Sequence, residues 1–165
     1  MSSTEPGAIA TLQAHIKKHL DLLNQSRQEI TDAFSKDIPL IGKTPRAAVL
    51  IAGLLENYYT CIETVFVRIS QFFENNLDDA RWHKDLLERM TLEITPIRPQ
   101  VISQPVKEDL VEIMRFRHFR RYYFGTAYDW ERLDALVIRC NRVHPTLLTE
   151  LHNFLDFLDT MLKNG

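Results

Sequence analysis

Reactive side chains are concentrated in ten consecutive residues, RFRHFRRYYF at 115–124, which hold four arginines, one histidine, two tyrosines and three phenylalanines. A guanidinium group can bind two phosphate oxygens at once, aromatic rings stack on nucleobases, and an imidazole exchanges protons near neutral pH. The combination favours binding of RNA or of a nucleotide. Because the whole chain carries a formal net charge of -2, we expect a local cleft and not a broad surface coated by nucleic acid.

A helical projection of residues 106–124 shows which of these side chains share a face with apolar residues. One side of this helix carries Leu110, Ile113, Met114, Arg117, Arg121 and Phe124. Arg117 therefore lies on the side expected to face the core, where a charge is costly unless a partner or a cleft receives it. We expect Arg117, His118, Arg121 and Tyr122 to form one polar patch at the edge of the apolar stripe.

Helix electrostatics offers a simpler explanation for the same charges. Acids occupy the first half of this helix (Glu108, Asp109 and Glu112), and arginines occupy its end, as the helix dipole favours. Glu112 can also pair with Arg115 at a spacing of three residues. This explanation covers Arg115 and Arg120, but it does not explain why Arg117 lies on the apolar side.

Other polar residues offer fewer candidates. No histidine pair combines metal-ligand spacing with a nearby carboxylate or cysteine, so we predict no metal and no cofactor. Two cysteines are too few for a disulfide framework, and we expect Cys61 and Cys140 to be reduced core residues. We expect Trp82 to fill the core, with base stacking as the alternative, and His83 to be a capping or surface residue, with a place in the cleft as the alternative. Glu74, Asp78 and Asp79 are expected to form a solvated helix end.

Apolar spacing predicts five helical segments that position these residues. They span about 8–34, about 44–74 with Thr44 and Pro45 as its N-cap and first residue, about 79–94, 106–124, and 129–163. We expect the sequence IPLIGKTP to end the first helix and residues 95–105 to form an irregular crossing between helices. We expect Pro145 to kink or break the last helix.

Long amphipathic helices joined by short connections fold most readily as an antiparallel bundle. We therefore predict an all-α, up-and-down four-helix bundle, with the short segment 79–94 packed outside it and residues 1–165 in a single domain. The longest apolar stretch, 47–55, is far below the roughly 20 residues of a membrane span. With no basic and hydrophobic leader in MSSTEPGAIA, we expect a cytoplasmic protein.

Three ordered blocks carry a resemblance to a known family: WHKDLLERMTLEITPIRPQVIS at 82–103, LVEIMRFRHFRRYYF at 110–124, and YDWERL at 128–133. Together they resemble the HepT-like branch of the HEPN superfamily over about residues 46–155. Residues 1–43 fall outside the resemblance and are expected to form an N-terminal packing helix.

The resemblance implies a HEPN-like bundle that forms a homodimer and acts as the toxin of a toxin-antitoxin pair. Family members are typically metal-independent endoribonucleases whose two motif copies meet in a cleft at the dimer interface. The antitoxin is a minimal nucleotidyltransferase, called MNT, which binds the toxin and in some systems attaches AMP to a tyrosine near the active site.

The family signature is an arginine, four further residues, a histidine, one residue and a tyrosine. Aligned on this helix, the arginine falls at Arg117, but Tyr122 stands at the histidine position and Phe124 at the tyrosine position. The usual general base and the usual modified hydroxyl are thus absent from those positions.

Three interpretations of this departure are open. In the first, Arg117 and His118 are catalytic: His118 removes the ribose 2′ proton, and Arg117 stabilises the phosphate. The further RNA-binding residues are Arg120, Arg121 and Tyr122. Tyr123 or Tyr122 then accepts AMP. In the second, the chain binds RNA without cutting it. In the third, it is a catalytically inactive binding subunit for its nucleotidyltransferase. A tyrosine with its usual pKa of about 10 is a poor base at neutral pH, which favours His118 over Tyr122.

Overall fold

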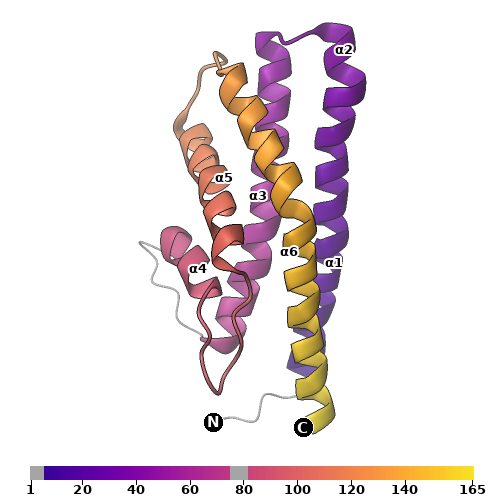
Figure 1. The fold of residues 1–165 in the computed structure, drawn as a ribbon, viewed down its shortest axis with the longest axis vertical. Coiled ribbons are helices and arrows are strands. Elements are labelled where there is room, and N and C mark those ends of the chain that lie inside the picture. Colours follow the sequence, from indigo (N-terminus) through magenta and orange to yellow (C-terminus); the bar gives the residue numbers. More distant parts are fainter. Residues whose placement is uncertain (1–5, 75–81) are drawn as a thin grey trace.

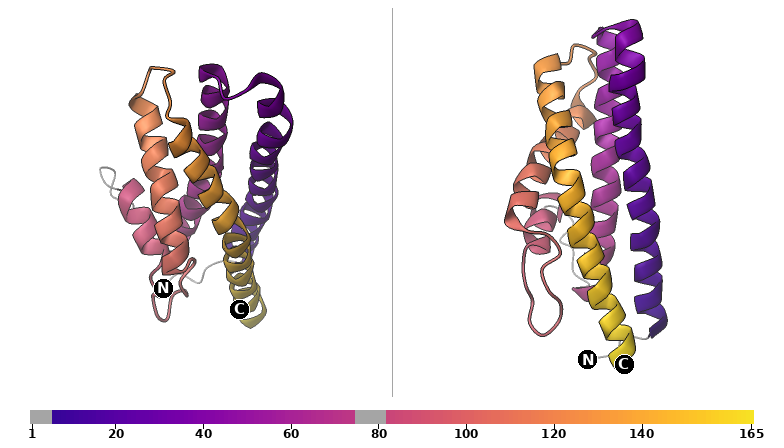
Figure 2. Two further views of the ribbon diagram at one scale, coloured as in Figure 1. Left: turned by 45° about the horizontal axis from the view of Figure 1, so that its top comes forward. Right: turned by 45° about the vertical axis from the view of Figure 1, so that its right-hand side comes forward.

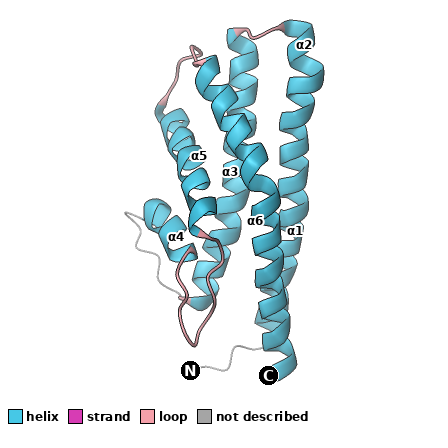
Figure 3. Ribbon diagram, viewed as in Figure 1, coloured by secondary structure: helices cyan, strands magenta, loops and turns pink. Residues whose placement is uncertain are grey.

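The structure, a computed structural model, describes residues 6–74 and 82–165, and at 82–84 it describes the backbone alone. All regular secondary structure in these ranges is helical (Figure 3). The elements are α1 (Pro6–Asp32), a π-helical turn (Ala33–Asp37), α2 (Ile38–Ile41), α3 (Pro45–Phe73), α4 (Trp82–Met90), α5 (Gln104–Tyr122) and α6 (Trp130–Asn164). The predicted all-α class is therefore confirmed for the described residues.

Four long helices form the bundle. α1, α3, α5 and α6 alternate in direction, so that successive long helices are antiparallel (Figure 1). α3 contacts α1, α5 and α6, while α6 also contacts α1 and α5, and one hydrophobic core runs through all of them. The short helix α4 packs on α3 and α5 at the outside of the bundle, which Figure 2 shows from two further directions. The predicted architecture is correct.

The first helix continues further than predicted. It was expected to end near residue 34, yet the backbone stays helical to Ile41 and leaves the helix at Gly42, where φ is 77°, so the break falls inside IPLIGKTP as expected. The π-helical turn ends just before Ile38 and Pro39. Its wider hydrogen-bond spacing accommodates the proline, which lacks the N–H that an α-helix needs there. The true break thus falls at the glycine, which adopts a left-handed conformation at little cost.

The helix boundaries of α3 and α6 follow local sequence signals. The Thr44 hydroxyl accepts a hydrogen bond from the Ala47 amide at 3.1 Å, and Pro45 is the first residue of α3, as predicted. α6 remains a single helix through Pro145, so the proline does not break it. The axis of α6 changes direction about midway along its length (Figure 1), which matches the alternative expectation of a kink.

The segment after α4 was predicted least well. The helix expected to reach Ile94 ends at Met90, and an irregular segment with a bridge between Ile94 and Arg98 follows. Arg98 has a fully buried side chain, and its guanidinium donates to the carbonyls of Leu92 at 3.0 Å, Pro99 at 3.1 Å and Arg89 at 3.0 Å. These bonds fix the shape of the segment.

Glu74 supplies the negative charge that this buried arginine requires. Its Oε1 accepts from Arg98 Nε at 3.1 Å and from Nη2, while Oε2 lies 3.3 Å from Arg89 Nη1. The predicted solvated end is therefore wrong for Glu74, whose side chain is only 14% exposed. Asp78 and Asp79 lie outside the described residues, as do the side chains of Trp82 and His83, so the predictions for them stay untested.

A buried polar group joins α1, α3 and α6. His144 lies with Nδ1 3.0 Å from the Tyr58 hydroxyl and Nε2 2.9 Å from Oδ1 of Asn24. Because the amide oxygen can only accept, Nε2 carries the proton and Nδ1 accepts from the tyrosine. Burial lowers the pKa of His144 to about 4, with a smaller effect from Arg27.

The two cysteines differ in position. Cys140 is buried, as predicted, and burial raises the pKa of its thiol to about 12. Cys61 is half-buried at the surface between α1 and α3, and burial raises its pKa to about 11. Both are free thiols in the structure. Within the described ranges, no helix is long and apolar enough to cross a membrane.

Candidate functional site

Helix α5 carries the arginine-rich stretch. Its buried residues are Val106, Leu110, Ile113, Met114 and Phe116. The predicted apolar stripe is correct through Met114, but it does not continue to Arg121 and Phe124. Arg121 is exposed, and Phe124 lies two residues beyond the helix end with 95% of its surface exposed. The last buried residue of α5 is Phe116 instead.

Arg117 has a partner within its own chain. Its Nη1 lies 3.2 Å from Oε2 of Glu63 on α3, and its Cζ lies 5.9 Å from the ring centre of Tyr59. The side chains of Arg117 and Glu63 are 16% and 7% exposed. The charge on the apolar side of α5 is thus compensated by a buried carboxylate, as its position requires. Burial raises the pKa of Tyr59 well above its usual range, with Glu63 adding to the rise and Arg117 opposing it.

Arg120 also faces α3. Its Nη1 forms an ion pair with Oε2 of Glu56, and both side chains are about one quarter to one third exposed, at 25% and 31%. A β-carbon added at Gly53 would lie 3.5 Å from Arg120 Nη2, so the guanidinium rests directly on the α3 backbone. Two of the predicted phosphate-binding arginines are therefore held by carboxylates one helix away.

Arg121 and Tyr122 point into solvent. Both are exposed, Tyr122 by 74%, and the Arg121 guanidinium lies 6.0 Å from the Tyr122 ring centre. His118 is half-buried. These residues therefore do not form the single polar patch that was expected: Arg117 faces α3, whereas Arg121 and Tyr122 form the solvent-exposed part of the site.

Tyr123 belongs to an aromatic cluster that sequence reasoning missed. Its ring stacks on Phe119 at 4.9 Å and meets Tyr128 edge-on at 5.2 Å. Its hydroxyl donates to the Ala127 carbonyl at 3.3 Å. A β-carbon at Gly125 would come within 2.7 Å of that hydroxyl, so the connection between α5 and α6 folds closely around the ring. Of the two tyrosines, Tyr122 has the more accessible hydroxyl.

Sequence reasoning also missed the residues of α3 that contact the arginines. Glu56, Tyr59 and Glu63 follow one another at spacings of three and four, and therefore share one face of α3. The stretch was interpreted only as a buried apolar helix. Two carboxylates on one face of such a helix are a usable signal, because a buried acid needs a cationic partner.

In the described part of the chain, no group of three or more histidine, cysteine, aspartate or glutamate side chains is arranged to hold a metal ion.

The up-and-down helical bundle has the architecture expected of a HEPN-like domain, and the family follows from comparison with known proteins. A family model described as HepT-like protein matches residues 50–158, which include the α3 carboxylates and all of α5. Because the match covers well over half of the sequence, the chain belongs to the HepT-like family. Neither the curated proteins nor the solved structures gave a significant match.

Proposed function

We propose that this protein is the toxin of a HEPN/MNT toxin-antitoxin pair and cleaves RNA without a metal ion. The observation that carries the proposal is the HepT-like match across the helix that holds Arg117. Arg117 stands at the arginine position of the family signature, and its side chain keeps a small exposed fraction, 16%, beside the exposed Arg121 and Tyr122.

In this proposal His118 acts as the general base. It removes the proton of a ribose 2′ hydroxyl, the resulting oxygen attacks the adjacent phosphorus to form a 2′,3′-cyclic phosphate, and the 5′ oxygen leaves and takes up a proton from water. Arg117 stabilises the negative charge that develops on the phosphate. Arg121, which pairs with no carboxylate in the described residues, binds a neighbouring phosphate, and Arg120 and Tyr122 extend the contact. The site is completed in a homodimer, in which a second copy contributes the opposite wall of the cleft.

Growth arrest tests the toxin role. Expression of the chain alone is expected to stop growth, and co-expression of a neighbouring nucleotidyltransferase is expected to relieve the arrest. His118→Ala should abolish the arrest, while Arg115→Ala, which removes only the surface ion pair with Glu112, should preserve it. Arrest that persists undiminished in His118→Ala would remove this histidine from the mechanism.

The second candidate function is a catalytically inactive binding subunit for the nucleotidyltransferase. The residues at the two departing signature positions favour it, because Tyr122 and Phe124 are 74% and 95% exposed and neither is held in a catalytic arrangement. With Phe119, which is 42% exposed, they place three exposed aromatic rings at the end of α5 and just beyond it. Exposed aromatic groups of this kind are typical of protein interfaces. This function predicts a stable complex with MNT and no cleavage by the free protein.

AMP transfer tests whether a nucleotidyltransferase is the partner of this protein, and the test applies to both candidate functions. The nucleotidyltransferase would join AMP from ATP to a tyrosine oxygen and release pyrophosphate. The exposure of Tyr122, compared with the stacked and hydrogen-bonded Tyr123, makes Tyr122 the expected acceptor. Intact-mass and peptide mass spectrometry should find the adduct in wild type and Tyr123→Phe but not in Tyr122→Phe. An adduct retained in Tyr122→Phe would assign the modification elsewhere.

A further inference from the structure

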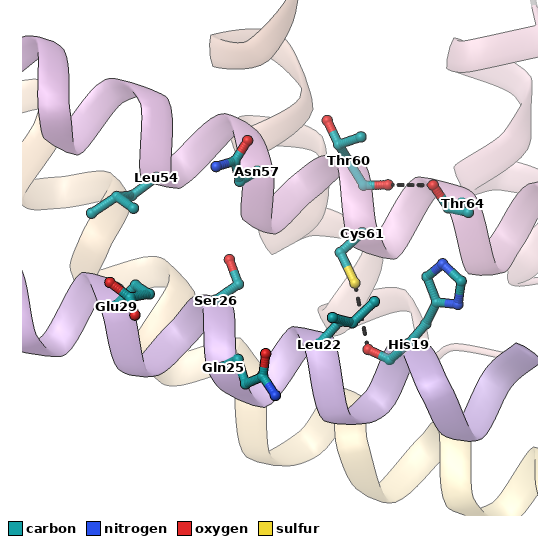
Figure 4. A pocket seen from close by; sticks show the side chains of 10 residues that line it. All are labelled: His19, Leu22, Gln25, Ser26, Glu29, Leu54, Asn57, Thr60, Cys61 and Thr64. Atoms are coloured by element: carbon teal, nitrogen blue, oxygen red, sulfur yellow. Dashed lines mark hydrogen bonds between the residues drawn. The ribbon is translucent and has the colours of Figure 1, made fainter.

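The outer side of the α1–α3 pair carries two hollows that no residue of α5 lines. The upper hollow, of about 440 Å³, lies between the second half of α1 and the middle of α3 (Figure 4). The Cys61 thiol there donates to the His19 carbonyl at 3.4 Å, and Glu29 supplies a negative charge. The lower hollow, of about 360 Å³, lies between the first turns of α1 and the last turns of α3, and none of the described residues that line it is an acid.

Arg68 is the unusual residue of the lower hollow. It has no ion pair and no hydrogen bond in the described part of the chain, and its Nε is shielded from water without an acceptor. A shielded donor without an acceptor costs about 1–3 kcal/mol, and a charged one costs more. By contrast, Arg117 and Arg120, the half-buried arginines of α5 that face α3, each have a carboxylate partner. Arg68 thus retains an unused capacity for an anion.

His15 faces the same space from α1. It is half-buried and lines the lower hollow together with Arg68. The pKa of His15 is lowered, first by burial and then by the Arg68 guanidinium, so the two side chains act on each other electrostatically. In its neutral form as in its protonated form, the imidazole has an N–H that can donate a hydrogen bond to an oxyanion.

The walls of the lower hollow are mostly apolar. Leu12 is buried at 4% exposure and Phe72 is half-buried, while Gly7 and Ala8 of the first turn of α1 add no bulky group. The first turn of a long helix also favours a negative charge in its vicinity. A ligand in this space therefore meets a cationic group at one place and apolar surface over most of the rest, with the polar side chains of Thr11 and Gln71 also lining the hollow.

We infer that the lower hollow is a binding site for an organic oxyanion, a carboxylate or phosphate ester attached to a compact apolar body. Arg68 pairs with the oxyanion, His15 donates a second hydrogen bond to it, and Leu12 and Phe72 contact the apolar body. The site is separate from α5, so it does not depend on RNA cleavage.

Isothermal titration calorimetry on the full chain tests this site with four probes: hydrocinnamate, phenyl phosphate, inorganic phosphate, and the neutral amide of hydrocinnamate. Saturable one-to-one binding is expected for hydrocinnamate and for phenyl phosphate, and such binding by either probe supports the inference. Inorganic phosphate and the amide are expected to bind more weakly. Arg68→Met keeps the apolar stem and should weaken binding by at least about 10-fold, because it removes the charged hydrogen bonds. His15→Gln should weaken it less, and Arg115→Gln, on α5, should leave it unchanged.

Three results would overturn the inference. Equal binding of the amide and the acid would show that the charge is not recognised. Equal binding of inorganic phosphate and phenyl phosphate would show that the apolar body is not recognised. Undiminished binding to Arg68→Met, verified as folded by circular dichroism, would place the anion elsewhere. Loss of RNA cleavage alone, with probe binding intact, would bear on the α5 proposal and not on this site.

Discussion

At the scale of single residues, the contact between Arg117 and Glu63 decides how much of the Arg117 charge is available to a phosphate. A guanidinium 3.2 Å from a nearly buried carboxylate is stabilised, but part of its charge is already neutralised. A phosphate that approaches Arg117 must therefore compete with Glu63, whereas Arg121 offers its charge without such competition. The residue that the family signature identifies is thus also an internal structural contact of the bundle.

Neutralising Glu63 separates these two roles. Glu63→Gln is expected to lower the free energy of unfolding by about 1–3 kcal/mol, because Arg117 loses its carboxylate partner. The same change should strengthen RNA binding, since the full charge of Arg117 becomes available. Chemical denaturation and fluorescence anisotropy with a labelled single-stranded RNA measure the two effects. Glu112→Gln, which frees the surface Arg115, is the matched control and should change stability by less than about 0.5 kcal/mol. Weaker RNA binding by Glu63→Gln would show that the carboxylate positions Arg117 and does not compete with the phosphate.

The buried His144 predicts a dependence of stability on pH. Its pKa is lowered to about 4 in the folded state from a usual value of 6.5, so the unfolded chain takes up a proton first as the pH falls. The contribution of His144 is therefore complete above about pH 6.5 and is lost as the pH falls toward 4. Between pH 7.5 and 5, we expect the free energy of unfolding to fall by roughly 1–2 kcal/mol from this group.

Denaturant unfolding at both pH values measures this change. In His144→Leu the fall should be smaller by about that amount, while the exposed His152→Gln should behave as wild type. An identical pH dependence in His144→Leu and wild type would contradict the assignment.

At the scale of elements, local signals predicted the helices, and distant contacts decided the connections. Thr44 and Pro45 define the start of α3 because N-capping involves only neighbouring residues. Helix periodicity also placed Met114 and the residues before it in the core. The segment after α4 was not predictable in this way, because its shape depends on Arg98 and on Glu74, 24 residues earlier.

The same limit applies to the candidate site. The composition of residues 115–124 identified the helix, but its arginines find their acids 54 and 64 residues away, at Glu63 and Glu56. A projection of one helix shows which side chains share a face, but not which neighbouring helix supplies their partners. The observed end of α5 at Tyr122 lies two residues before the predicted end, and the ring of the next residue, Tyr123, contacts Tyr128, a partner that a projection of α5 alone does not show.

Loss of the Glu74 carboxylate should destabilise the segment after α4 in particular. Glu74→Ala leaves the buried Arg98 without its acid and should lower the free energy of unfolding by about 3–5 kcal/mol. Hydrogen exchange should show faster exchange for the amides of Val101 and Ile102, which donate to the Met90 carbonyl, than for the centre of α3. Glu88→Ala, which removes the more exposed pair with Lys107, is the control and should cost less than about 1 kcal/mol. Equal effects of the two substitutions would mean that the buried ion pair does not hold this segment.

At the scale of the whole molecule, different parts of the bundle form the core and the exposed aromatic surface. α3 is packed on three sides by α1, α5 and α6, so it provides both the core and the acids that hold the α5 arginines. The end of α5 and the connection to α6 expose aromatic rings and Arg121, which suits the proposed homodimer and partner interface. The assignment of residues 1–165 to one domain, with residues 1–43 as a packing helix, stays a prediction.

The proposed homodimer can be tested at the scale of the whole molecule. Light scattering after size-exclusion chromatography should give twice the chain mass of 19.3 kDa for the wild type. Phe124→Ser combined with Tyr122→Ser should shift the equilibrium toward the monomer, because the two most exposed rings at the end of α5 are lost. Leu40→Ser, which removes an equally exposed apolar side chain at the tip of α2, should leave the dimer intact. A wild-type protein that stays monomeric at high concentration would contradict the shared cleft.

Cleavage of RNA by the purified protein in the presence of EDTA tests the central claim most directly. Arg117→Met combined with Glu63→Leu removes the charged pair without leaving either charge buried, so this variant should remain folded. The wild type is expected to produce discrete fragments from single-stranded RNA, and the double variant is expected to cleave at least about 100-fold more slowly. Equal cleavage by the folded double variant, or no cleavage by the wild type on any RNA tested, would contradict a phosphate site built on Arg117.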